Sequence, residues 1–195
     1  MSKNETLNVI LIRHGQTQAN ACGVAQGQTD SALTQEGVAE TLRKAAILNG
    51  HVFHAVYCSD LPRAMATMRI VRNAIPGLPE PAFTPQLREI DFGDYSGMDK
   101  ERIMPVIMRH KADKSLRYPN GECGNDLIAR TDGFFRTLMS RHMGESVLVI
   151  THYGIMETAA RLFTGFPADK AVVIGGDDVW EMEFDANGMA KLRVV

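Results

Sequence analysis

Cysteine is scarce in this sequence and occurs in no metal-binding or disulfide pattern. The chain of 195 residues has three cysteines, Cys22, Cys58 and Cys123, and no CxxC pair. Neither a disulfide framework nor a cysteine-ligated zinc site is therefore indicated. We expect three free thiols, as in a protein of a reducing compartment.

Long apolar runs and a surplus of charge are also missing. The apolar run near the N-terminus, residues 9–12, is far shorter than a signal segment or the roughly 20 residues of a membrane span. The 21 Lys and Arg against 23 Asp and Glu leave a formal net charge of −2, spread along the length. A nucleic-acid surface would need clustered positive charge. We expect a cytoplasmic protein with no membrane or nucleic-acid partner.

Strand and helix patterns alternate over most of the chain. Short apolar runs predict strands, and apolar residues at helical spacing predict helices. The expected helix 33–48 has Thr34 as its N-cap, Ser59-Asp60 caps the next helix, the proline-rich residues 76–85 break the pattern, and Pro105 interrupts a helix. The expected strands are 7–12, 54–58, 147–150, 179–184 and 189–194, and the expected helices are 33–48, 59–75, 99–110, 126–142 and 155–163.

This alternation predicts one α/β domain over residues 1–195, built on a mostly parallel sheet. The last two strands are joined by the turn Asp185-Ala186-Asn187-Gly188 and predict a hairpin with an antiparallel edge strand.

Chemically active residues follow three of the predicted strands. The first strand ends in Arg13-His14-Gly15, the second leads into a helix that carries Arg63, and a later strand ends in Thr151-His152-Tyr153-Gly154. Ligands of open α/β sheets bind beyond the carboxyl ends of the strands. Two histidines and two arginines are therefore expected to meet at one rim.

Such a rim suits a phosphate ester. Two guanidinium groups can neutralise a phosphate dianion with forked hydrogen bonds, and helix N-termini add backbone N–H groups. Gly15 would let the backbone approach the ligand without a Cβ clash. An imidazole nitrogen can then attack phosphorus, while a carboxylic acid such as Glu89 protonates the leaving oxygen. No metal and no cofactor are required if arginines stabilise the charge.

The sequence resembles the histidine phosphatase superfamily, also called phosphoglycerate mutase-like, over roughly residues 7–166. A lone Arg-His-Gly would be weak evidence, but several blocks occur in the order of the family. They are Leu11-Ile12-Arg13-His14-Gly15-Gln16-Thr17-Gln18-Ala19-Asn20, Gly27 with Asp30, Leu33-Thr34-x-x-Gly37, Ser59-Asp60-Leu61-x-Arg63-Ala64-x-x-Thr67, Leu87-Arg88-Glu89-Ile90-x-Phe92-Gly93-x-Tyr95-x-Gly97, Gly121-Glu122 with Asp126-Leu127-x-x-Arg130, and Thr151-His152-x-Gly154.

The resemblance implies a mostly parallel, six-stranded sheet flanked by helices, and it implies roles for particular residues. His14 would be the nucleophile and Glu89 the proton donor. The transferring phosphoryl group would be clamped by Arg13, Arg63 and His152, and phosphate or substrate would touch Asn20 and the backbone of Gln26 and Gly27.

Three positions depart from the family pattern, and each concerns the substrate pocket. Tyr153 stands where glycine usually follows the second histidine, which would narrow the substrate-binding rim. Tyr95 replaces a frequent tryptophan, and Cys123 replaces a serine. None of the three removes a catalytic group.

The expected activity is that of a phosphomonoesterase whose partner is a small-molecule phosphate ester. The alternative is a phosphoglycerate mutase, whose relatives usually carry an insertion and paired arginines after the Glu89 block. This chain has a short segment there with arginines placed singly, at Arg102, Arg109 and Arg117. A non-catalytic phospho-ligand binder is a further alternative. The physiological substrate stays open among α-ribazole phosphate, phosphoserine, sugar phosphates and phosphoglycerates, and the oligomeric state between monomer and homodimer.

Other charged motifs favour structural interpretations. His51 and His54 form an H-x-x-H without a third ligand nearby, which is typical of surface residues rather than of a metal site. Glu36 and Glu122 are interpreted as structural carboxylates.

Overall fold

Six strands form a single mixed sheet at the centre of the computed structural model, which describes residues 6–167 and 170–195. The strands lie in the order β3-β2-β4-β1-β5-β6. Their bounds are β1 Leu7–Arg13, β2 Ala55–Ser59, β3 Pro81–Thr84, β4 Ser146–Thr151, β5 Val179–Phe184 and β6 Ala190–Val194. Strands β1 to β4 are parallel, and β5 is antiparallel to both β1 and β6. The predicted α/β class and the C-terminal hairpin are confirmed.

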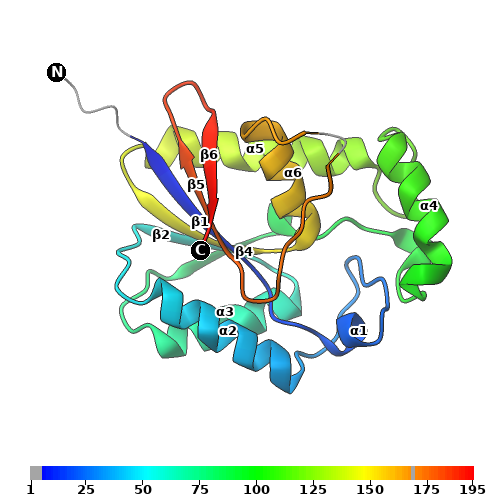
Figure 1. Ribbon diagram of the computed structural model, residues 1–195, viewed down its shortest axis with the longest axis horizontal. Coiled ribbons are helices and arrows are strands. Elements are labelled where there is room, and N and C mark those ends of the chain that lie inside the picture. The colour runs from blue at the N-terminus through cyan, green and yellow to red at the C-terminus, as the bar shows by residue number, and fades with distance from the viewer. Residues whose placement is uncertain (1–5, 168–169) are drawn as a thin grey trace.

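Helices cover both faces of the sheet (Figure 1). Their bounds are α1 Gln18–Ala21, α2 Gln35–Leu48, α3 Pro62–Ala74, α4 Lys100–Ala112, α5 Gly124–His142 and α6 Tyr153–Phe163, with short 3-10 turns at Pro85–Leu87 and Gly93–Tyr95. Residues of β1 alternate between two cores because successive strand side chains point to opposite faces. Leu7, Val9 and Leu11 pack toward α5 and α6, whereas Ile10 and Ile12 pack toward α2 and α3.

Two expectations about helix starts have different outcomes. Thr34 caps α2 as predicted, since its side chain accepts a hydrogen bond from the Gly37 N–H. Ser59-Asp60 does not cap α3. Leu61 is the N-cap residue there, and Pro62 occupies the first turn, where a missing N–H costs nothing.

The proline-rich segment contains a strand that the sequence pattern did not predict. Residues Pro81–Thr84 form β3, which pairs in parallel with β2 at the edge of the sheet. Proline is compatible with an edge strand because one side of it needs no ladder hydrogen bonds. The prolines of residues 76–85 therefore break the sequence pattern without preventing a strand at the sheet edge.

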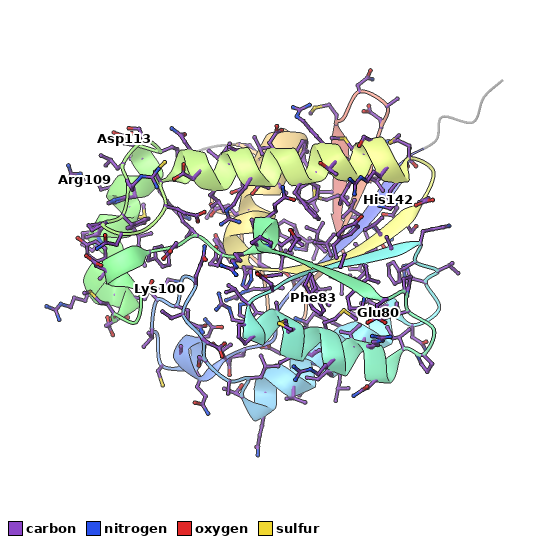
Figure 2. The ribbon with its side chains drawn as sticks, turned by 180° about the vertical axis from the view of Figure 1, so that it is seen from behind. Glu80, Phe83, Lys100, Arg109, Asp113 and His142 are labelled. Carbon is purple, nitrogen blue, oxygen red and sulfur yellow. The ribbon has the colours of Figure 1, made fainter. Side chains whose placement is uncertain are left out.

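Helix α4 runs through Pro105 without a break and begins at the N-cap Asp99. It stands apart from the two helical layers, at one end of the molecule (Figure 1). The view from behind shows Lys100, Arg109 and Asp113 at this end, with His142 and the β3 residue Phe83 toward the other (Figure 2). Ile103 and Ile107 of α4 form a small core of their own with Ala25.

Candidate active site

Three parallel strands end side by side and place the predicted residues at one rim. Arg13 of β1 lies in register with Thr151 of β4, and β2 pairs with the other side of β4 and ends at Ser59. His14 and His152 come directly after β1 and β4, and their rings are 5.0 Å apart between centroids. The expected convergence at the carboxyl ends is therefore present.

His14 is buried, and its two ring nitrogens have different partners. Its Nδ1 lies 2.8 Å from the Gly15 carbonyl oxygen, which can only accept, so Nδ1 carries the proton. Arg63 Nε donates to His14 Nε2 at 3.2 Å, so Nε2 presents a lone pair. Burial and the charges of Arg63 and Arg13 hold the pKa of His14 well below its ordinary value. The ring is a neutral imidazole with its basic nitrogen beside an arginine.

Arg63 is 2% exposed and rigidly held at the start of α3. Its Nη1 donates to the Thr29 carbonyl at 2.8 Å, and its Nη2 donates to the Gly27 carbonyl at 2.6 Å. Burial lowers its pKa to about 10, so the guanidinium stays charged at neutral pH. No carboxylate lies within salt-bridge distance in the part of the chain that is described, which leaves this charge available for an anion.

Arg13 lies on the same rim, and its main chain is held from behind by Lys44. Arg13 Nε is buried and has no hydrogen-bond partner among the described residues, although it lies in the wall of the cavity. Lys44 is fully buried on the inner side of α2, and its Nζ donates to the Arg13 carbonyl at 2.7 Å. Burial lowers the pKa of Lys44 to about 8.

His152 is completely buried beneath the rim. Its Nε2 lies 2.8 Å from Ser59 Oγ, and its Nδ1 has no partner within the described ranges. Burial, followed by the charge of Arg63, lowers the pKa of His152 well below its ordinary value. A neutral ring with one unused nitrogen is thus placed next to His14.

Glu89 is held on the other side of the rim by the first turn of α6. Both carboxylate oxygens accept from the Gly154 N–H at 3.1 Å, and Oε1 also accepts from the Ile90 N–H at 2.9 Å. A Cβ at position 154 would come within 2.1 Å of Glu89 Oε1, so a larger residue there would displace this carboxylate. The N-terminal N–H of α6 therefore holds Glu89 and is not left for a phosphate, which corrects one expectation.

Gly15 is also required for a reason other than the expected one. A Cβ there would lie 2.2 Å from the Gly37 carbonyl oxygen and 2.7 Å from Thr41 Oγ1. The close approach is thus to the start of α2 and not to a ligand.

A partly buried ion pair supports the Glu89 segment. Arg130 of α5 pairs with Glu122, and its Nη2 donates to the Glu89 carbonyl at 3.0 Å. Glu122 also accepts from the Asp91 N–H at 3.0 Å. The structural interpretation of Glu122 agrees with these contacts, and Glu36 likewise makes a surface pair with Arg43.

The residues predicted to touch substrate all line the cavity, but they differ in whether their polar atoms already have hydrogen-bond partners. Gln26 is buried, with Oε1 accepting from Thr17 Oγ1 and with Nε2 without a partner in the described chain. Asn20 Oδ1 is already used by the Thr17 N–H, and the Gly27 carbonyl is used by Arg63. Gln26 Nε2 is therefore the clearest remaining donor for a substrate.

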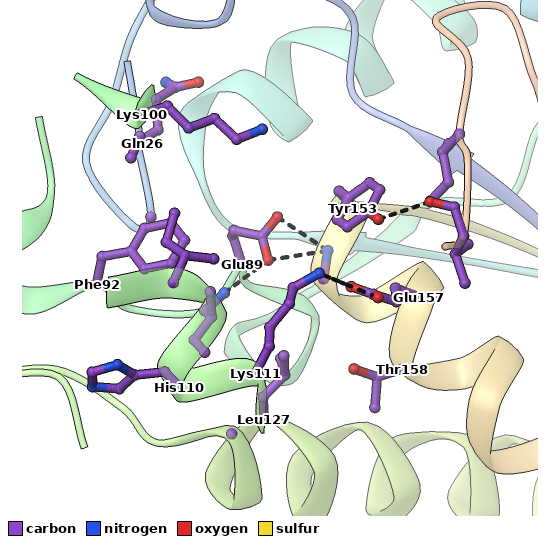
Figure 3. A pocket seen from close by; sticks show the side chains of 18 of the residues that line it. Gln26, Glu89, Phe92, Lys100, His110, Lys111, Leu127, Tyr153, Glu157 and Thr158 are labelled. Carbon is purple, nitrogen blue, oxygen red and sulfur yellow. Dashed lines mark hydrogen bonds and ion pairs between the residues drawn. The ribbon is translucent and has the colours of Figure 1, made fainter. Parts of the chain in front are cut away.

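These residues form one end of a cavity of about 650 Å³ (Figure 3). Tyr153 lies in its wall, and its hydroxyl donates to the Val172 carbonyl at 2.8 Å. The Nζ of Lys111 in α4 lies 2.9 Å from a carboxylate oxygen of Glu157 in α6. Figure 3 shows this pair. The cavity therefore extends from His14 to α4. Its lining comes from helices that are distant in sequence and share no motif.

Within residues 6–167 and 170–195, no group of three His, Cys, Asp or Glu side chains is arranged to hold a metal ion. His54 accepts from the Ser146 N–H through Nδ1, and His51 stacks on Phe53 with ring centroids 5.9 Å apart. The interpretation of the H-x-x-H as a non-ligand pair is consistent with these contacts. In the same ranges, no helix is long and apolar enough to cross a bilayer.

Four supporting residues received no role from the sequence. Thr67 Oγ1 accepts from the Gly15 N–H at 3.1 Å, Ser59 meets His152, Arg130 braces Glu89, and Lys44 holds Arg13. The first three lie in the family blocks, so their positions were visible. Lys44 follows Thr41 by three residues on the inner face of α2, which is an unusual place for a lysine and the one available signal.

Known proteins share both the sequence pattern and the fold. The sequence model of the histidine phosphatase superfamily (branch 1) matches residues 9–193. An adenosylcobalamin/alpha-ribazole phosphatase of Escherichia coli K12 is 30% identical over 82% of this chain and 80% of its own length. A 2,3-bisphosphoglycerate-dependent phosphoglycerate mutase of Rhizobium etli is 34% identical over 74% of each chain. The crystal structure of the alpha-ribazole phosphatase from Shigella flexneri is 29% identical, with a TM-score of 0.79 over 96% of this chain and 95% of that one. The chain belongs to the histidine phosphatase superfamily, branch 1.

Proposed function

We propose that this protein is a metal-independent phosphomonoesterase that hydrolyses a small phosphorylated metabolite through a phosphohistidine on His14. The observation that carries the proposal is the state of the His14 ring. Its Nδ1 proton is engaged by Gly15, and its Nε2 lone pair lies beside the Arg63 guanidinium. A neutral imidazole is a nucleophile at neutral pH, and the arginine beside it attracts the phosphate that it must attack.

In the first step, His14 Nε2 forms a bond to phosphorus while the bond from phosphorus to the ester oxygen breaks. Arg63, Arg13 and the buried His152 and Gln26 groups surround the transferring oxygens, and positive charge stabilises them best in the transition state. Glu89 in its acid form gives its proton to the departing oxygen, which leaves as an alcohol.

In the second step, water attacks the phosphohistidine. The carboxylate of Glu89 takes a proton from that water, the bond between phosphorus and Nε2 breaks, and inorganic phosphate is released. Glu89 is then protonated again and His14 neutral again, so each turnover consumes only ester and water. The clamp charges come from arginines, so no metal is needed to balance the dianion.

Mutase activity is the second candidate because a curated mutase shares 34% identity with this chain. A mutase must return the phosphoryl group to a bound glycerate, whose carboxylate needs its own cation. Of the described arginines, Arg13, Arg63 and Arg161 line the cavity, and Arg161 already pairs with Glu157. Arg109 lies on the exposed side of α4 (Figure 2). No described arginine of the lining is therefore free for that carboxylate, and a mutase would have to use Lys100 or Lys114 instead.

The test is phosphate release from p-nitrophenyl phosphate in excess EDTA. We expect the wild-type protein to turn over, His14→Ala to be inactive, and acid-labile labelling by substrate phosphate to occur only with His14 present. His51→Ala, a change at an exposed histidine, is the matched control and should behave as wild type.

Four results would contradict the proposal. Normal turnover by His14→Ala would remove the phosphohistidine, and activity that returns only with added magnesium or zinc would remove metal independence. Interconversion of phosphoglycerates without net phosphate release would identify a mutase instead. Binding of phosphate esters without any turnover would identify a non-catalytic binder.

A further inference from the structure

Apolar side chains from four separate segments line part of the cavity. We call this part the apolar wall, formed by Met104, Ile107 and Met108 of α4, Leu127 of α5, Leu162 of α6, and Val173. The residues of the apolar wall are distant in sequence and follow no fixed spacing. No sequence motif therefore predicts them. A substrate bound by its phosphate at His14 would have to place its remaining part in the direction of the apolar wall.

Two residues of the apolar wall are exposed to solvent although they are apolar. Met108 is 58% exposed and Val173 is 80% exposed. Single exposed apolar side chains are common, but these two border the same cavity from α4 and from the segment before β5. Apolar groups gathered around one concave site are typical of ligand contact.

Three charged side chains near the apolar wall are paired with one another. Glu157 pairs with Lys111 at 2.9 Å and with Arg161 at 3.0 Å, and Lys111 also lies over the Tyr153 ring. Figure 3 shows the Lys111–Glu157 pair within the cavity. Lys100 and Lys114 add positive charge to the lining, which attracts the phosphate dianion of any ester.

The size of the cavity also favours a substrate with a large group beside its phosphate. A cavity of about 650 Å³ lies in the middle of the range that holds drug-sized ligands. The phosphate-binding residues account for one end of it. The remaining volume would stay largely unfilled by the alcohol of a three-carbon phosphate ester.

We infer that the substrate of the proposed phosphatase carries a bulky apolar or aromatic leaving group that packs against the apolar wall. The inference rests on the proposed function and specifies the class of ester. Tyr153 lines the same cavity, with its hydroxyl donating to the Val172 carbonyl and with Lys111 Nζ over its ring.

The test compares two esters that make the same chemical demand. 2-(1-Naphthyl)ethyl phosphate and ethyl phosphate both release a primary alkoxide, so Glu89 is needed to a similar degree. We expect kcat/KM to be at least about tenfold higher for the naphthyl ester, the size of effect that apolar contacts give in a pocket. Equal kcat/KM values would overturn the inference and leave the phosphatase proposal standing.

A double variant locates the preference. Met108→Gln with Val173→Asn introduces polar atoms of similar size into the apolar wall, and should lower the ratio of the two kcat/KM values by about tenfold. The matched control is Met189→Gln with Val52→Asn, at positions that are 50% and 76% exposed and outside the cavity lining. It should keep the wild-type ratio. An unchanged ratio in the first variant would overturn the assignment to this wall.

Binding provides a readout that needs no turnover. 3-(1-Naphthyl)propylphosphonate and propylphosphonate cannot be hydrolysed, and calorimetry gives their affinities directly. We expect the naphthyl compound to bind at least about tenfold more tightly to the wild-type protein, and this advantage to shrink in the Met108/Val173 variant. Tight naphthyl binding without turnover of any ester would support the apolar wall while contradicting the phosphatase proposal. Equal affinities would overturn the inference itself.

Discussion

Arg63 and Glu89 both lie at the rim but have different hydrogen-bond partners, which suggests that they have different roles. Arg63 is fixed by the Thr29 and Gly27 carbonyls and points Nε at His14. The Glu89 carboxylate is held through the backbone N–H groups of Gly154 and Ile90, and no side chain pairs with it in the described ranges. In the proposed reaction, the arginine would contact the phosphoryl oxygens and the carboxyl group would carry the proton.

The first prediction separates these two functions. Arg63→Ala should lower kcat/KM for every phosphate ester, because its contacts are strongest in the transition state. Glu89→Gln should slow alkyl phosphates far more than p-nitrophenyl phosphate, whose phenolate barely needs a proton, by a factor of about 10² to 10⁴. Single-turnover rates measure this, because they isolate phosphorylation of His14. Equal losses for both ester types would show that Glu89 is not the proton donor, and Asp91 and Asp94 would be tested next.

Burial of the charged Lys44 side chain lowers the stability of the folded protein, and its hydrogen bond to the rim residue Arg13 offsets part of this loss. Its pKa is lowered from 10.5 to about 8 by burial, so the folded protein carries an ammonium group in an unfavourable place at pH 7. A shift of that size corresponds to about 3 kcal/mol, against which stands its hydrogen bond to the Arg13 carbonyl, worth about 1.5 to 3 kcal/mol. The net effect of the side chain on folding is therefore small or unfavourable.

The second prediction follows from that balance. Lys44→Met should raise the free energy of unfolding at pH 7 by about 1 kcal/mol, yet lower kcat, because the Arg13 carbonyl loses its support. The unfolded chain binds more protons than the folded chain between about pH 8 and 10.5, so the stability gain should shrink over that interval. Urea unfolding at several pH values tests this, with exposed Lys191→Met as the control. A variant that is both less stable and fully active would refute it.

Among the elements, α4 combines an exposed position with an internal proline. Pro105 lies in the middle of Lys100–Ala112, so the Glu101 carbonyl has no N–H four residues later to accept from. This helix supplies three residues of the apolar wall, and Lys111 ties it to α6 through Glu157. Its stability therefore affects the shape of the cavity.

The third prediction concerns this proline. Pro105→Ala should raise the free energy of unfolding by about 1 to 2 kcal/mol, since the restored hydrogen bond and relieved clash exceed the extra freedom of the unfolded chain. Pro62→Ala is the matched control, because Pro62 sits in the first turn of α3, where its N–H has no helical partner. Pro62→Ala should give no gain. Equal effects of the two substitutions in urea unfolding would contradict the explanation.

At the scale of the whole molecule, folding buries two histidines in their neutral form. The rings of His14 and His152 are 5% and 0% exposed, and burial with the nearby arginines lowers both pKa values. The unfolded chain takes up a proton on each ring as pH falls below about 6.5, whereas the folded chain does not. Stability is thus retained above pH 6.5 and lost below it.

The fourth prediction is the size of that loss. Between pH 7.5 and 5.5 the free energy of unfolding should fall, with an upper limit of about 3 kcal/mol set by protonation of the two rings in the unfolded chain. His152→Asn should remove about half of the fall, whereas the exposed His51→Asn should leave it unchanged. Urea unfolding of the three proteins at both pH values provides the comparison. A His152→Asn variant with the full wild-type pH dependence would show that the buried ring is not the source.

Local patterns in the sequence were sufficient for much of the fold and of the rim. The short apolar run of β1, the Thr34 cap of α2 and the C-terminal hairpin each depend on neighbours within a few residues, so their signals are complete in the chain itself. The family blocks located His14, Arg63, Glu89 and His152 for the same reason, and the parallel order of β1, β2 and β4 brings them together. Their catalytic roles remain predictions.

Tertiary contacts decided the rest, because they depend on residues that are distant in sequence. Strand β3 exists because β2 offers an edge to Pro81–Thr84, and Gly15 is needed because α2 comes within contact of it. Lys44 is tolerated because it meets the Arg13 carbonyl, 31 residues away. The cavity beyond Tyr153 arises only where α4, α5, α6 and Val172 converge. The sequence alone indicated the histidines, arginines and carboxylate that were expected at the rim, because each lies in a local motif. Packing at long range determined how these groups are held and which side chains line the cavity beside them.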